Sequence, residues 1–224
     1  MFAVAFSGLA EEPKVELLRV GQFHGKEVTA QSCSEWFALV RNEDGCVLRR
    51  VEVEIQTVFD PIMDAEGEAT GKQVRVDLDR EPLFLVRGFE FCMPGEIPAV
   101  SLEQSFVYPA QEVRLTLDRG ATWRLRGYGS VERGRGLSIR NYTLELAGSR
   151  HGDPGQVIHA VDGGVELGEI YPIWAGDLDL DGSIDLLLET GNHYNVMEYT
   201  LYLSSAADEG ELVKRVAVFR TVGC

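Results

Sequence analysis

The sequence predicts an all-β protein, a β-sandwich or a related antiparallel β fold that could comprise two β subdomains. Three observations indicate this class: polar and apolar residues alternate in several segments, the apolar segments are short, and 24 glycines and 8 prolines separate them. A strand with one buried face has a two-residue repeat, whereas an amphipathic helix needs a 3.6-residue repeat over about ten or more positions. Of the 224 residues, 45% are hydrophobic, which is enough to bury a substantial core.

The alternation is clearest between Val51 and Gln56 and between Val113 and Asp118, where every second residue is apolar. Each segment therefore puts its apolar side chains on one face of a strand. Asp118-Arg-Gly120 predicts a turn, and Trp123 begins the returning strand of a hairpin. The other predicted strands lie at Val15–Val20, Trp36–Val40, Val74–Leu78, Leu83–Val86, Leu137–Leu146, Val157–Val161, Ile184–Leu188, Tyr199–Leu203 and Leu212–Phe219.

Helix is expected only as a turn or two, in Ser101–Phe106 and Ser204–Val213, because neither segment sustains the spacing of an amphipathic helix. The Pro-rich stretch from Met93 to Pro109 is the best candidate for a domain boundary. We therefore predict an N-terminal β domain at 11–100 and a C-terminal β domain at 101–224. A long connection inside a single sandwich is the alternative.

The first ten residues, Met1–Ala10, are apolar and small and precede Glu11, Glu12 and Pro13, which is typical of the end of a signal peptide cleaved after Ala10. They lack the basic residues that begin a complete signal peptide, so an accidental likeness is the alternative. We predict a periplasmic or secreted protein. No apolar stretch reaches about 18 residues, so no transmembrane segment is expected.

The chain is strongly acidic, with a formal net charge of -15 from 36 Asp and Glu against 21 Lys and Arg. Such a charge repels the phosphates of nucleic acids and of anionic membrane surfaces. We therefore expect no nucleic-acid partner, and an acidic surface is compatible with cation binding.

The four cysteines, Cys33, Cys46, Cys92 and Cys224, show no C-x-x-C spacing, which argues against a zinc site and is compatible with two disulfides. If residues 42–45 form a hairpin turn, Cys33 and Cys46 lie roughly 26 Å apart along the paired strands, too far for a disulfide. Cys92 and Cys224 would then each pair with one cysteine of the hairpin. Four unpaired thiols are the alternative.

One loop carries recognisable chemistry. Residues 177–185, D-L-D-L-D-G-S-I-D, place oxygen donors at the first, third, fifth and ninth positions and glycine at the sixth. Calcium binds about 6–8 oxygens at about 2.3–2.6 Å, and glycine lets a tight loop bend toward the ion. The alternatives are a solvated acidic turn and a magnesium site. The predicted Ca²⁺ ligands are the carboxylates of Asp177, Asp179, Asp181 and Asp185 and the carbonyl of Ser183.

An EF-hand is disfavoured, because its twelfth position would be Leu188, and apolar strands rather than helices are expected on both sides of the loop. From Trp174 to about Thr190 the residues resemble the FG-GAP and integrin-type calcium loop, D-x-D-x-D-G-x-x-D followed by an apolar strand. Leu180 departs from it, since many members of that family have glycine there. The resemblance implies a metal site only, because a single copy cannot build the propeller of that family.

No motif of a known catalytic class is present: G-x-S-x-G, H-E-x-x-H and a Gly-rich phosphate loop are missing, and the four histidines have no ligand spacing. Gly191–Asn195, just after the acidic loop, is either a recognition surface or an ordinary turn. We predict an exported calcium-binding β protein with a noncatalytic binding or envelope-interaction role and an unknown protein or carbohydrate partner. The alternatives are a calcium-supported hydrolase and a single-repeat relative of a propeller. Aromatic side chains for a binding surface would come from Trp174, Tyr194 or Tyr199, although we expect each of them rather to be a buried strand aromatic.

Overall fold

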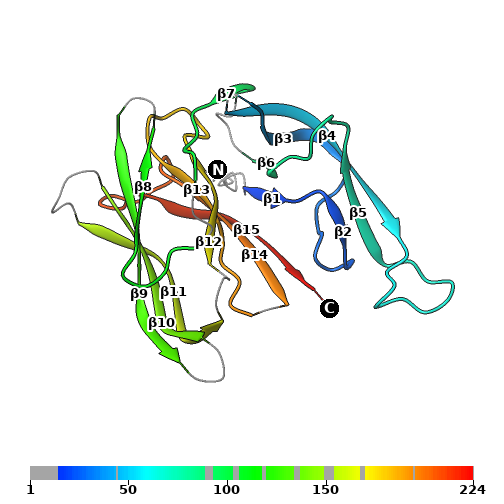
Figure 1. The fold of residues 1–224 in the computed structure, drawn as a ribbon. Helices are drawn as coiled ribbons and strands as arrows, with labels where there is room; N and C mark the ends of the chain where they lie inside the picture. Colours follow the sequence, from blue (N-terminus) through cyan, green and yellow to red (C-terminus); the bar gives the residue numbers. More distant parts are fainter. Residues whose placement is uncertain are drawn as a thin grey trace, which may run out of the picture.

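All regular elements in the described part of the chain are β-strands, which confirms the all-β class. The named strands pair only in antiparallel fashion and form three sheets (Figure 1). The computed structural model describes residues 15–43, 45–88, 93–102, 106–117, 120–133, 137–148, 154–166, 170–193 and 195–223.

The N-terminal sheet has the strand order β1-β6-β3-β4-β5-β2, with β7 also paired to β4. Strands β1 and β2 follow each other in the chain but lie at opposite ends of this order, so the link Arg19-Val20 joins the two edges and the sheet curls into a half-barrel. Its strands are β1 (Glu16–Leu18), β2 (Gly21–Phe23), β3 (Cys33–Arg41), β4 (Cys46–Val58), β5 (Gly71–Val76), β6 (Phe84–Arg87) and β7 (Gly95–Ile97).

The other two sheets are four-stranded meanders, in which each strand pairs with the next one in the chain. The outer sheet consists of β8 (Glu112–Thr116), β9 (Thr122–Arg133), β10 (Leu137–Ala147) and β11 (Gly155–Glu166). The central sheet consists of β12 (Tyr171–Gly176), β13 (Asp185–Glu189), β14 (Val196–Leu203) and β15 (Lys214–Val222).

The central sheet lies between the other two sheets (Figure 1). Leu187 and Leu201 belong to the core shared with the N-terminal sheet, whereas Leu186 and Leu188 belong to the core shared with the outer sheet. Every residue of β13 is buried. A strand covered on both faces has no need of polar alternation, which explains why the sequence of β13 is a continuous apolar run between its acidic ends.

The predicted strands match the structure, and the hairpin at 42–45 is confirmed by a hydrogen bond from the Asn42 amide to the Gly45 carbonyl (2.9 Å) and by the pairing of Arg41 with Cys46. Strands β2 and β7 were not predicted, because three residues are too few to show a repeat. The helical turns expected at 204–213 are hydrogen-bonded turns that form no helix. The described residues of 101–106 are not helical either.

The change of sheet falls near the predicted boundary at residue 100, since the N-terminal sheet ends at Ile97 and the next strand begins at Glu112. The core nevertheless continues across this boundary. The rings of Phe84 and Trp174 lie 5.9 Å apart, and those of Phe23 and Phe219 lie 5.1 Å apart. That the two parts are separate domains stays a prediction.

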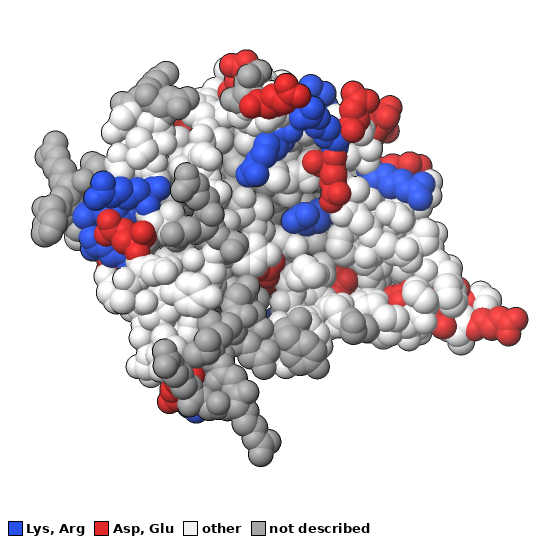
Figure 2. All heavy atoms as spheres, viewed as in Figure 1, with Lys and Arg blue, Asp and Glu red and all other residues white. Residues whose placement is uncertain are grey.

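The N-terminal residues 1–10, predicted to be the end of a signal peptide, lie outside the described residues. In the described part of the chain there is no helix with the length and apolarity needed to cross a membrane. The face shown in Figure 2 carries acidic and basic side chains side by side, and neither sign forms a continuous patch there.

The expected disulfides are not seen in the described part of the chain, where Cys33 and Cys46 are free thiols; Cys92 and Cys224 lie outside it. The register of β3 and β4 explains why Cys33 and Cys46 do not bond to each other, since Cys33 is opposite Val53, far along the pair from Cys46. Cys33 instead accepts a hydrogen bond from Arg87 Nη1 (3.0 Å). Burial raises the pKa of the Cys46 thiol.

A partly buried ion pair connects the residue that follows β2 to the segment after β4. Asp60 is 3% exposed, and its Oδ2 lies 2.5 Å from His24 Nδ1, while its Oδ1 accepts hydrogen bonds from the amides of Ile62 and Met63. The hydrogen bond to Asp60 raises the pKa of His24, and the hydrogen bond to His24 lowers the pKa of Asp60. The contact therefore depends on a protonated imidazole beside an ionised carboxylate.

We expect this pair to stabilise the fold most between the ordinary pKa values of Asp, about 4, and of His, about 6.5. Because the folded pKa of His24 is raised, its contribution is complete below about pH 6.5 and is lost as the pH rises through the folded pKa. The contribution of Asp60 is lost as the pH falls through its lowered pKa. The difference in melting temperature between the native protein and His24→Gln should therefore shrink from pH 6 to pH 9, and a constant difference would contradict this assignment.

Candidate metal centre

The acidic loop connects two adjacent strands of the central sheet. Gly176 at the end of β12 pairs with Asp185 at the start of β13, so the register of the sheet positions both ends of the loop. Two apolar side chains of the loop are each 1% exposed: Leu178 packs in the core of the N-terminal sheet, and Ile184 in the core of the outer sheet. The loop is therefore anchored in both cores.

Three of the predicted ligands come together. Asp177, Asp179 and Asp185 each offer one carboxylate oxygen, and these three oxygens lie within 4.8 Å of one another. Two Ca²⁺–O bonds of about 2.4 Å each span up to about 4.8 Å, so the spacing of these oxygens is compatible with binding of one ion.

Two carboxylate oxygens of these residues are without hydrogen-bond partners among the described residues: Oδ1 of Asp177 and Oδ1 of Asp179 are both buried and accept no hydrogen bond. Asp177 is 5% exposed, and Asp185 is fully buried. Leaving a buried carboxylate oxygen unsatisfied costs free energy, and a bound cation would remove that cost. The residues present therefore fit a hard divalent cation.

Oδ2 of Asp177 and Oδ2 of Asp185 accept hydrogen bonds from the loop backbone. The Gly182 amide donates to Asp177 Oδ2 (2.9 Å), and the Leu178 amide donates to Asp185 Oδ2 (2.7 Å). Burial raises the pKa of Asp177, and burial together with the charge of Asp179 raises the pKa of Asp185 to about 8. Without a cation, the site thus favours protonation, and a cation would compete with that proton.

Asp181, by contrast, is exposed and does not belong to the three-oxygen group. Its Oδ1 accepts a hydrogen bond from the Ser183 amide (2.7 Å), and its Oδ2 accepts one from the Ser204 hydroxyl (3.0 Å). Ligation by the Asp181 carboxylate and by the Ser183 carbonyl stays a prediction.

The backbone at Leu180 adopts a conformation that favours glycine. Leu180 has a φ of 63°, in the left-handed region, and Gly182 has a φ of 89°. A side chain in this region costs about 1 kcal/mol because its Cβ approaches the following carbonyl oxygen. Leu180 is 49% exposed, so packing of its side chain compensates little of this cost.

Leu180→Gly should therefore increase the free energy of unfolding by about 0.5–1 kcal/mol, the relief of strain being partly offset by the greater freedom of glycine in the unfolded chain. Leu180→Ala is the control, because it removes the same exposed side chain but keeps a Cβ in the left-handed conformation. Chemical denaturation of both variants in calcium measures the difference. Equal stabilities of the two variants would show that the strain is unimportant.

Sequence reasoning missed Ser204 and Ser205, which follow β14. The Ser204 amide and hydroxyl both donate to Asp185 Oδ1 (2.8 and 3.0 Å), and the Ser205 hydroxyl donates to Asp179 Oδ2. No local signal marks these serines. Only the pairing of β13 with β14 brings the residues that follow β14 next to the loop.

The three aromatic residues considered for a binding surface differ in their surroundings. Trp174 is 1% exposed and packs in the core, so it is not part of a surface. Tyr199 is partly buried, stacks on Phe219 with 6.4 Å between ring centroids, and has the Arg19 guanidinium 4.8 Å from its ring centroid. Tyr194 lies outside the described residues. The burial of Trp174 agrees with the expectation of a buried strand aromatic and excludes this residue from a binding surface.

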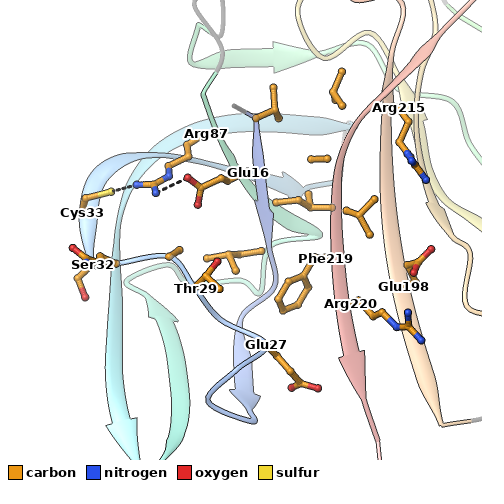
Figure 3. Close-up of a pocket in the computed structure, with 18 residues that line it drawn as sticks. Glu16, Glu27, Thr29, Ser32, Cys33, Arg87, Glu198, Arg215, Phe219 and Arg220 are labelled. Atoms are coloured by element: carbon orange, nitrogen blue, oxygen red, sulfur yellow. Dashed lines mark hydrogen bonds and ion pairs between the residues drawn. The ribbon is translucent and has the colours of Figure 1, made fainter. Parts of the chain in front are cut away.

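A groove with a volume of about 840 Å³ lies between β1, the segment before β3, and β15 (Figure 3). On one side Arg87 donates to Glu16 (2.7 Å) and to Cys33, and Arg215 and Arg220 lie on the other side (Figure 3). None of the described residues that line the groove is a histidine. Cys33 therefore has no imidazole base among them.

A second cavity of about 410 Å³ contains the His24–Asp60 pair. Its described lining contains no serine or cysteine that could act as a nucleophile beside this histidine. Its apolar rim includes three exposed side chains: Ile62, Met197 and Val222 are 57%, 52% and 44% exposed.

Fold and loop together define a three-sheet antiparallel β protein with a candidate cation centre in its central sheet. Comparisons with models of known protein families, with curated proteins and with solved structures gave no significant match to this chain.

Proposed function

We propose that this protein is an exported, calcium-binding β protein with a noncatalytic binding or envelope-interaction role, in which the ion held by residues 177–185 is mainly structural. One observation carries the proposal: the unpartnered, buried oxygens of Asp177 and Asp179 lie in a group of three carboxylates that one cation can contact. A solvated acidic turn would instead keep its carboxylates in water.

The position of the loop supports a structural ion. The loop joins β12 to β13 and is anchored on both sides by buried apolar residues, so an ion there would cross-link the centre of the three-layer fold. Neither of the two cavities described above is lined by an aspartate of this loop. The ion would therefore lie apart from both surfaces at which another molecule could be accommodated.

The chemistry of the donors supports calcium among the common cations. The three grouped donors are all carboxylate oxygens, and hard cations prefer oxygen ligands. Magnesium demands a near-ideal octahedron and keeps several waters, which suits a buried group of three carboxylates less well. The binding role is supported by the apolar rim of the second cavity, since exposed apolar patches mark contact sites.

Titration calorimetry of chelator-treated protein tests the proposal directly. We expect one Ca²⁺ per chain, weaker binding of Mg²⁺, and loss of calcium binding in Asp179→Asn. Asp162→Asn is the matched control, because Asp162 is an exposed aspartate on β11, remote from the loop in sequence. Failure of the native protein to bind at millimolar calcium would refute the proposed metal centre.

A further inference from the structure

The candidate metal centre has a second half, contributed by the connection between β14 and β15. Three aspartates of the acidic loop accept hydrogen bonds from Ser204 or Ser205, 19 to 26 residues further along the chain. Ser204 bonds to Asp181 and Asp185, and Ser205 bonds to Asp179. The loop alone therefore does not determine where its carboxylates point.

The Ser205 contact leaves the unpartnered oxygen of Asp179 available to an ion. The Ser205 hydroxyl donates to Oδ2 of Asp179, while Oδ1 of the same carboxylate is buried without a partner. The Ser204 amide and hydroxyl both donate to Oδ1 of Asp185. A hydroxyl that holds one oxygen of a carboxylate orients the other, and such outer contacts strengthen metal binding.

The other end of this connection is held by the outer sheet. The side chain of Gln156 on β11 accepts hydrogen bonds from the amides of Leu212 (2.8 Å) and Val213 (3.0 Å) and donates to the Val213 carbonyl (2.8 Å). Val213 is fully buried in the core of the outer sheet, and Ala206 packs against the core of the N-terminal sheet. The segment 204–213 thus touches all three layers.

We propose that Ser204 and Ser205 are positioning residues for the cation, and that cation binding and the ordering of residues 204–213 form one linked equilibrium. This inference rests on the proposed calcium site and extends it to a segment outside the acidic loop. Linkage works in both directions. A cation that fixes the carboxylates also fixes the serines bonded to them, and loss of the serine hydroxyls lowers the affinity of the site for the cation.

The test compares calcium affinity in the full-length native protein, in Ser205→Ala, and in the double variant Ser204→Ala/Ser205→Ala. We expect the dissociation constant of Ca²⁺ to rise about tenfold in the double variant, by an amount typical of lost outer contacts. The double replacement by threonine keeps both hydroxyls and should restore affinity. Ser130→Ala, at an exposed serine on β9, is the matched control and should bind like the native protein.

Two measurements distinguish a role of Ser204 and Ser205 in positioning the carboxylates from a role in folding alone. The melting temperature in chelator should change much less than the calcium affinity, and Ser205→Ala, at an exposed residue, provides a mild variant if the double variant folds poorly. Hydrogen exchange should show that calcium slows exchange in residues 204–213 of the native protein, and less so in the double variant.

The outcomes are distinguishable. If the native protein binds no calcium, the proposed function fails and this inference fails with it. If the native protein binds calcium and the double variant binds it within twofold as tightly, only the inference is overturned. Protection confined to residues 177–185 would likewise overturn the link to the β14–β15 connection.

Discussion

Asp177→Asn should change the melting temperature in opposite directions with and without calcium. In chelator the variant should melt higher than the native protein, because burial raises the pKa of Asp177 and its charge destabilises the cation-free fold at neutral pH. The Asn amide can keep the bond from the Gly182 amide through its oxygen and offer its NH₂ group to the neighbouring carboxylates. Replacing the charged carboxylate by the neutral amide should increase the free energy of unfolding in chelator by about 1 kcal/mol.

In calcium the order should reverse. At a calcium concentration about 100 times the dissociation constant, binding stabilises the native protein by about 2.7 kcal/mol, which corresponds to roughly 5–10 °C in melting temperature for a chain of this size. Asp177→Asn loses one of the three grouped ligands, so its melting temperature should not respond to calcium. Differential scanning calorimetry with chelator and with calcium provides all four values.

Asp162→Asn serves as control here as well and should follow the native protein in both conditions. The opposite changes in chelator and in calcium are the informative result, because a simple loss of packing would lower the melting temperature of Asp177→Asn in both conditions. If Asp177→Asn melts below the native protein in chelator by the same margin as in calcium, Asp177 is a structural hydrogen-bond acceptor and no metal ligand.

Local sequence patterns predicted what depends on neighbouring residues. The alternation in β4 and β8 and the turn at residues 42–45 appear in the structure as expected, because a two-residue repeat and a turn are properties of a few consecutive residues. The clustering of Asp177, Asp179 and Asp185 belongs to the same category, since a nine-residue loop limits how far its side chains can separate.

The features that the sequence did not predict depend on contacts between distant segments. Nothing near Ser204 indicates that it will bond to Asp185, because the two meet only through the pairing of β13 and β14. The burial of Trp174 likewise depends on Phe84, ninety residues earlier in the chain, whose ring it contacts. The cysteine count could not predict the free thiols of Cys33 and Cys46 for a related reason: an even number says nothing about whether two thiols approach each other across a sheet.

Gly176→Ala should produce one of the largest losses of stability that a single methyl group can cause in this chain. A Cβ at this position would lie 2.4 Å from the Pro98 carbonyl oxygen and 2.3 Å from Cζ2 of the buried Trp174. Neither neighbour can move cheaply, because one is backbone and the other is packed in the core. We expect the free energy of unfolding to fall by about 3 kcal/mol and the melting temperature by roughly 10 °C.

The steric clash in Gly176→Ala should also lower the calcium affinity of the metal centre. The Asp177 amide donates to the Pro98 carbonyl and the Val100 amide donates to the Ala175 carbonyl, both at 2.9 Å, so the segment between the N-terminal and outer sheets crosses β12 at the point where the acidic loop begins. An alanine would push this segment away and displace Asp177 with it. Calcium affinity should therefore fall together with stability, whereas a glycine needed only for chain flexibility would affect stability alone.

Gly164→Ala is the matched control, because Gly164 lies in β11 with open space where its Cβ would be. Its stability should stay within about 0.5 kcal/mol of the native protein, as for most surface substitutions. Chemical denaturation of both variants, with calcium titrated into each, measures stability and affinity on the same samples. If Gly176→Ala were as stable as Gly164→Ala, the close crossing of residues 98–100 over β12 would be wrong, and with it the way the fold presents Asp177 to the ion.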